Sequence, residues 1–114
     1  MILKTSVTKH GVQPAIWFAL GISEMVYRSN GLALTVTSLT DSHEDRPASL
    51  HNKGLAVDLR TRNIPLGLLS TVHGSLVSIL KPMGFDVVLE SNHIHVEWDP
   101  KGQETWQRVE IQIA

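Results

Sequence analysis

The segment Phe85-Asp-Val-Val-Leu-Glu-Ser-Asn-His-Ile-His-Val-Glu-Trp98 predicts a β-hairpin. Its two halves are rich in apolar and β-branched residues, which favour strands. Between them, Ser91-Asn92 consists of two residue types that are common in turns. We therefore expect two antiparallel strands, Phe85–Glu90 and His93–Trp98, joined by a two-residue turn.

The alternation within these strands assigns a core face and a polar face, because successive side chains of a strand point to opposite sides of a sheet. In the second strand the apolar side chains, expected in the core, are Ile94, Val96 and Trp98. The polar side chains on the opposite face are His93, His95 and Glu97. In the first strand the side chains expected in the core are Phe85, Val87 and Leu89. If Ser91-Asn92 is the turn, Glu90 lies across from His93, with Cβ atoms about 5 Å apart.

A further strand, Leu55–Arg60, alternates in the same way and places Asp58 on the side opposite the core. If helices cover the core side of the sheet, the other side is free to form a cleft. Four ionisable side chains are then expected to converge on that uncovered face: Asp58, Glu90, His93 and His95.

Two helices and two more strands are expected in the rest of the chain. The first helix, Pro14–Ser29, begins with a proline, which suits the first helical turn, and ends before Asn30-Gly31. The second helix covers Pro65–Lys81. The additional strands are Leu32–Ser38 and Arg108–Ile113. The large apolar residues of the first helix that we expect in the core are Trp17 and Phe18. We therefore predict that residues 1–114 form one α+β domain, a mostly antiparallel sheet with its helices on one face.

The composition excludes several classes of protein. The chain has 114 residues, 42% of them hydrophobic, with 10 basic and 11 acidic side chains and no basic block, so nucleic acid is not the expected partner. The absence of cysteine excludes disulfides and structural zinc sites built from thiolates. Met1–Gln13 lacks the basic start and long apolar region of a signal peptide. No apolar run approaches the roughly 20 residues of a membrane helix, so no membrane partner is expected.

Histidine and aspartate residues stand where they could share one metal ion. His51 and Asp58 are separated by six residues, and His93 and His95 follow downstream. Catalytic zinc sites use three nitrogen or oxygen ligands from the protein and leave one position open. Zinc acidifies water and polarises a carbonyl group, while a nearby carboxylate moves the proton; Glu90 is the best-placed carboxylate. The alternative is that both downstream histidines are ordinary surface residues of a strand.

The motif Ser49-x-His51-x-x-Gly54-x-Ala56-x-Asp58 resembles the first motif of the zinc D-alanyl-D-alanine carboxypeptidase family. This family includes vancomycin-resistance dipeptidases and phage L-alanyl-D-glutamate endolysins, and it belongs to a wider group with lysostaphin-type enzymes and the hedgehog signalling domain. His93-Ile-His95 is similar to the His-x-His variant of its second motif, so the resemblance covers residues 32–100. It implies a zinc site on the sheet face opposite the helices. The implied ligands are His51, Asp58 and His95, and His93 would help to stabilise an oxyanion.

One departure from the family pattern concerns the catalytic base. The acidic position three residues before His95 is occupied by Asn92, which cannot act as a base. Either Glu90 supplies the base from the facing strand, or Glu90-Ser-Asn-His93 is itself the acidic-x-x-His motif and His93 is the third ligand. We favour His95 as the ligand and Glu90 as the base.

A second departure concerns substrate binding. Family members carry Ser-Gly-aromatic-Arg after the first strand, whereas this chain has Ser38-Leu39-Thr40-Asp41. Arg46 or Arg60 is a candidate replacement for the missing arginine. The other candidate substrate contacts are His43 and Ser49.

The leading hypothesis is a zinc metallopeptidase that hydrolyses a peptide bond in peptidoglycan stem peptides or cross-links. The resemblance implies this cell-wall substrate. The lack of a signal peptide suits a phage enzyme that is made in the cytoplasm and released by a holin or carried in a virion. A second hypothesis is a catalytically weak or inactive zinc-binding module of the same fold that binds cell-wall peptides. A third is a small structural domain whose polar strand face is solvated.

Overall fold

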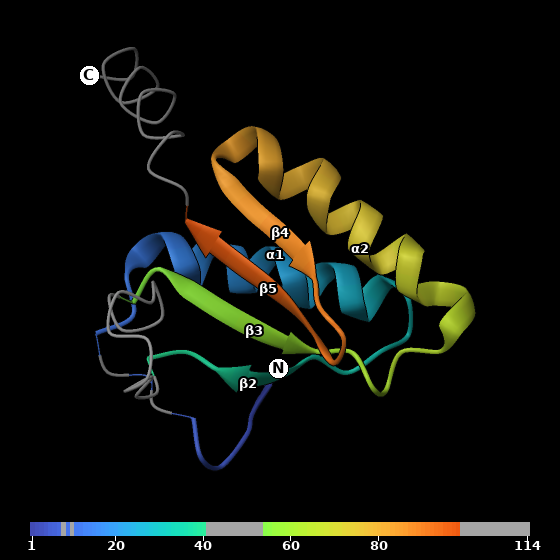
Figure 1. Cartoon of the computed structure of the whole chain (residues 1–114), viewed down its shortest axis with the longest axis horizontal. Coiled ribbons are helices and arrows are strands. Elements are labelled where there is room, and N and C mark those ends of the chain that lie inside the picture. Colours follow the sequence, from blue (N-terminus) through green and yellow to red (C-terminus); the bar gives the residue numbers. More distant parts are fainter. Residues whose placement is uncertain (8, 10, 41–53, 99–114) are drawn as a thin grey trace.

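The computed structural model describes residues 1–7, 9, 11–40 and 54–98 of the chain (Figure 1). The elements are β1 (Ile2–Leu3), α1 (Pro14–Ser29), β2 (Thr35–Ser38), β3 (Ala56–Arg60), α2 (Leu66–Leu80), a short 3-10 helix η1 (Lys81–Met83), β4 (Phe85–Leu89) and β5 (His93–Trp98). The strands form one sheet in the order β1-β2-β3-β5-β4. β1 is parallel to β2, and the other neighbouring strands are antiparallel.

The α+β class is confirmed, with a mixed sheet that is mostly antiparallel. The sequence does not predict β1, because two residues are too short for an alternating pattern to be visible. The expected strand Arg108–Ile113 lies outside the described residues.

The predicted hairpin is present as β4 and β5. Its register runs from Phe85 opposite Trp98 to Leu89 opposite Ile94. The backbone N–H of Glu90 donates to the carbonyl oxygen of His93 over 2.8 Å, which continues the same register. Residues 91–92 are therefore the two-residue connection, as the sequence predicts.

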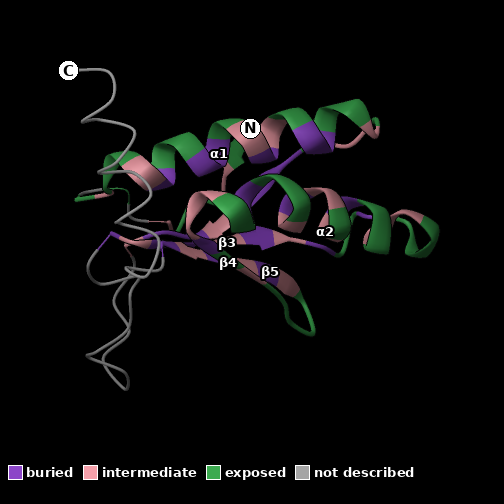
Figure 2. Cartoon of the chain, turned by 90° about the horizontal axis from the view of Figure 1, so that it is seen from above, coloured by how far each residue is buried: buried purple, intermediate pink, exposed green. Residues whose placement is uncertain are grey.

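Both helices pack on the same face of the sheet, with α1 and α2 forming a layer above it in Figure 2. The residues that α1 buries recur at helical spacing: Ile16, Ala19, Leu20, Ser23, Val26 and Tyr27. The residues that α2 buries are Val72, Leu76 and Leu80. The sheet contributes the fully buried Val57, Leu59, Ile94 and Val96. In the described part of the chain, no helix combines the length and the apolar character needed to cross a membrane.

The end of α1 explains why β2 is shorter than predicted. Gly31 has a φ of 72°, a left-handed conformation that suits glycine at the end of a helix. The next residue, Leu32, still donates its N–H to the carbonyl oxygen of Tyr27 over 2.9 Å. Because Leu32 closes the last turn of α1, the strand begins at Thr35 rather than at Leu32.

Three residues expected in the core are exposed. Trp17 and Phe18 are 42% and 41% exposed, because the buried side of α1 leaves them facing outward. Leu89 is 40% exposed. It is the last residue of β4, next to the tip of the β4–β5 hairpin, which bends away from the helix layer in Figure 2. In contrast, Trp98 is buried as expected and its ring packs edge-on against Phe85, with centroids 5.1 Å apart.

Candidate metal centre

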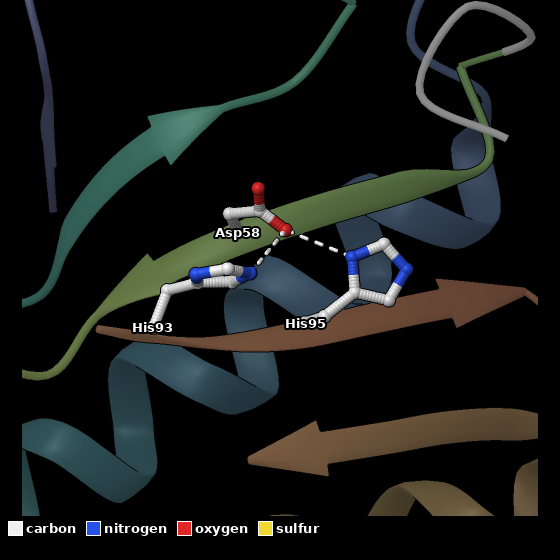
Figure 3. A group of neighbouring side chains, drawn as sticks. All are labelled: Asp58, His93 and His95. Carbon is white, nitrogen blue, oxygen red and sulfur yellow. Dashed lines mark hydrogen bonds and ion pairs between the residues drawn. The ribbon is translucent and has the colours of Figure 1, made fainter. Parts of the chain in front are cut away.

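The candidate metal centre lies on two neighbouring strands at the middle of the sheet. Asp58 of β3 is directly opposite His95 of β5, and Arg60 is opposite His93. Opposite residues of an antiparallel pair share a face, and this face is the one opposite α1 and α2. Figure 3 shows Asp58, His93 and His95 pointing toward one another. One potential ligand atom from each of the three lies within 4.8 Å of the other two.

Asp58 is the centre of this group. Its Oδ1 atom lies 2.8 Å from Nδ1 of His95 and 3.6 Å from Nε2 of His93. All three side chains are half-buried, so water is only partly excluded. One carboxylate oxygen and two imidazole nitrogens are a donor set that suits zinc.

His95 is held between two carboxylates. Its Nδ1 faces Asp58, and its Nε2 lies 3.2 Å from Oε1 of Glu97. Because a carboxylate only accepts hydrogen bonds, both ring nitrogens donate in this arrangement. The hydrogen bond to Asp58 is the main cause that raises the pKa of His95; burial of the ring opposes it, and the charges of Asp58 and Glu97 add to it.

Glu97 is the residue to which the sequence assigned no role. Alternation places it on the same polar face as His95, two residues further along β5, and its carboxylate reaches the ring of His95. Metal-binding histidines commonly donate their second N–H to a carboxylate, which orients the ring and makes the coordinating nitrogen more basic. The spacing His95-x-Glu97 on one strand is the signal that points to this pairing.

His93 is oriented by the side chain that precedes it. Its Nδ1 lies 2.6 Å from Oδ1 of Asn92, the residue at the family's acidic position. An amide oxygen accepts, so Nδ1 donates to Asn92, and Nε2 is the ring nitrogen on the side of Asp58, 3.6 Å from its Oδ1. Asn92 cannot act as a base, but it can fix the ring of His93.

The motif glycine and alanine have structural roles. Gly54 has a φ of 70°, and a Cβ atom at this position would overlap the carbonyl oxygen of Gly11. The carbonyl of Gly54 also accepts the N–H of Gln13 over 2.9 Å. These contacts hold the start of β3 against the segment that leads into α1. Ala56 is fully buried on the same face as Asp58, opposite Glu97.

A cavity of about 450 Å³ adjoins the cluster on the polar face of the sheet. Its walls come from β2, β3, β5 and the adjoining segments. The residues that line it are Lys4, Thr37, Ser38, Asp58, Arg60, Arg62, Asn92 and His93. His93 therefore lines the cavity, whereas His95 does not.

The structure places the predicted site residues as follows. Asp58, His93 and His95 come together, as the strand pattern predicts. Glu90 is exposed and lies across from His93 at the end of the hairpin. Among the described residues, no hydrogen bond or ion pair involves the Glu90 carboxylate. The remaining predicted residues lie outside the described part of the chain: the ligand His51 and the substrate contacts His43, Arg46 and Ser49.

Comparison with known proteins leaves the family assignment open. No protein-family model, no curated protein and no solved structure matches the chain. The resemblance to the zinc D-alanyl-D-alanine carboxypeptidases therefore stays a prediction that rests on the motif residues.

Proposed function

We propose that the chain is a zinc-dependent peptidase whose metal is held by His51, Asp58 and His95. The observation that carries this proposal is the convergence of Asp58, His93 and His95 beside a cavity on the open face of the sheet. A peptidase needs this combination, because the metal ligands must adjoin a space large enough for a peptide segment.

His95 is the better ligand of the two histidines. Its Nδ1 lies 2.8 Å from Oδ1 of Asp58, whereas Nε2 of His93 lies 3.6 Å from the same oxygen. Its other ring nitrogen, Nε2, hydrogen-bonds to Glu97. His93 faces the cavity and is braced by Asn92. We therefore assign His93 to the substrate: it hydrogen-bonds to the oxygen of the carbonyl group under attack, where negative charge develops.

A zinc ion at this centre would polarise the peptide carbonyl and make water acidic near neutral pH. The chain must then supply a base for the proton released when water attacks the carbonyl carbon. Glu97 is engaged by His95, whereas Glu90 lies across from His93 with its carboxylate exposed. We assign the proton to Glu90, which returns it to the amine nitrogen as the C–N bond breaks.

The substrate class follows from the motif resemblance, which favours peptides of the bacterial cell wall. A zinc-loaded sample would be incubated with purified peptidoglycan fragments, and the products would be identified by mass spectrometry. The expected result is hydrolysis of one peptide bond, abolished by a chelator and by Asp58→Asn. Absence of any product from a protein that does bind zinc would contradict the enzymatic proposal.

One observation favours a second candidate, a zinc-binding module without catalysis. The acidic position of the family motif holds Asn92, and this side chain braces His93 instead of moving a proton. If the second candidate holds, the zinc-loaded chain binds cell-wall peptides and leaves them intact in the same assay.

A further inference from the structure

Three cationic side chains line the cavity beside the candidate metal centre: Lys4, Arg60 and Arg62. They come from separate segments, since Lys4 follows β1, Arg60 ends β3, and Arg62 lies in the turn before α2. The fold thus gathers positive charge from three places at one point on the sheet face.

Arg60 has the most defined position of the three. It lies two residues after Asp58 on β3 and directly opposite His93, so its side chain shares their face. On the core side, the hydroxyl of Tyr27 donates to the carbonyl oxygen of Arg60 over 2.9 Å. This hydrogen bond from α1 fixes the backbone at the point where Arg60 meets the cavity.

The charges in the cavity wall do not balance. The wall contains three cationic side chains and the single carboxylate of Asp58, which is directed at His95. Within the described ranges, no ion pair involves Lys4, Arg60 or Arg62. A concave surface with an excess of one charge concentrates ligands of the opposite charge. Arginine in particular can hold a carboxylate through two parallel hydrogen bonds.

We propose that this cavity binds a carboxylate group of the peptide ligand, held by Arg60 and Arg62 and completed by Lys4. The proposal rests on the proposed function for the peptide nature of the ligand. A carboxylate held there would keep the adjacent part of the peptide beside His93.

The test measures binding of three small peptides to the isotopically labelled chain by nuclear magnetic resonance titration. N-acetyl-D-alanyl-D-alanine carries a terminal carboxylate, and its C-terminal amide carries none. N-acetyl-L-alanyl-D-glutamic acid α-amide carries only a side-chain carboxylate. Each titration is made with zinc-loaded protein and with chelator-treated protein, because zinc itself can hold a carboxylate.

We expect at least one carboxylate peptide to bind about tenfold or more tightly than the neutral amide, with or without zinc. The favoured peptide shows whether the terminal or the side-chain carboxylate is the one recognised. Arg60→Gln and Arg62→Gln should each weaken this preference, and the double variant should remove it. The matched control is Arg28→Gln, which should keep the preference. Arg28 is an exposed arginine of α1 that pairs with Glu24.

Three results would overturn the proposal. The neutral amide could bind as tightly as the carboxylate peptides, the preference could survive in the double variant, or the preference could exist only with zinc. Thermal melts of the single variants check that they remain folded. A chain that takes up no zinc but keeps the carboxylate preference refutes only the proposed function. A chain that binds zinc without the preference refutes only the carboxylate site.

Discussion

Nδ1 of His95 lies 2.8 Å from Oδ1 of Asp58, across the register that joins β5 to β3. This pairing links protonation, folding and metal binding at one atom. A proton on Nδ1 and a metal ion at Nδ1 compete for the same lone pair. The stability of the zinc-free chain and its affinity for zinc should therefore change with pH in opposite directions.

The first prediction concerns this pH dependence. In metal-free protein the folded pKa of His95 is raised above its unfolded value of about 6.5. Its contribution to stability is then fully present below that unfolded value and is lost as the pH rises through the folded pKa. Zinc affinity should change in the opposite direction, increasing with pH as the proton leaves. Thermal melts across this range with chelator and with zinc measure both trends.

His95→Gln is the control for the pH prediction, and it should remove both trends. His73→Gln should leave both unchanged. His73 lies on α2, and its Nε2 contacts the carbonyl oxygen of Val87 over 3.3 Å, away from the cluster. Zinc affinity that is independent of pH would count against His95 as a ligand.

The second prediction concerns Glu97. Glu97→Gln keeps the size of the side chain but removes the charge that makes His95 a stronger donor to a metal. We expect zinc affinity to fall by about tenfold or more, as is typical for carboxylates that support a metal-binding histidine. Isothermal titration calorimetry measures the change. Asp86→Asn is the matched control, because Asp86 is exposed and lies directly opposite Glu97 on β4; an equal loss in both variants would argue against a specific role for Glu97.

The third prediction separates the two carboxylates near the site. Glu90→Gln should leave zinc affinity unchanged and lower kcat by about a hundredfold or more, since a base contributes that much to proton transfer. The assay is the release of peptide products by zinc-loaded protein. If Glu90→Gln keeps full activity while zinc-loaded Glu97→Gln loses it, Glu97 is the base instead.

The fourth prediction compares two glycines with the same backbone conformation. Gly31 and Gly54 have φ values of 72° and 70°, but a Cβ atom meets nothing near Gly31 and overlaps Gly11 at Gly54. Gly31→Ala should cost about 1–2 kcal/mol for the left-handed conformation alone. Gly54→Ala should cost at least about 1 kcal/mol more, because the backbone must move. Urea unfolding measures the difference, and equal losses would show that the Gly11 contact is unimportant.

Local alternation made much of the polar face predictable. The hairpin follows from two alternating strands around Ser91-Asn92. The same pattern places Asp58 and His95 each on the polar face of its own strand. It does not show that β3 pairs with β5, because pairing between distant segments leaves no local periodicity. For the same reason the sequence does not show that Lys4, Arg60 and Arg62 line one cavity.

Hydrophobicity alone misplaced other residues. Trp17 and Phe18 are large and apolar, yet they lie outside the buried side of α1 that includes Ile16 and Leu20. Leu89 continues the alternation of β4, but at the end of the strand it is 40% exposed. In each case the position of the neighbouring layer, which the local sequence does not encode, determines the exposure.

The central claim is that Asp58 and His95 hold a zinc ion, and metal analysis of the purified chain tests it most directly. We predict about one zinc per chain in the wild type and in His73→Gln, and loss of that zinc in Asp58→Ala and His95→Ala. Zinc at a hundredfold excess over its Kd should add about 2.7 kcal/mol of stability and raise Tm by roughly 10 °C. A wild-type chain without bound zinc, or an Asp58→Ala variant that binds zinc as the wild type does, would contradict the claim.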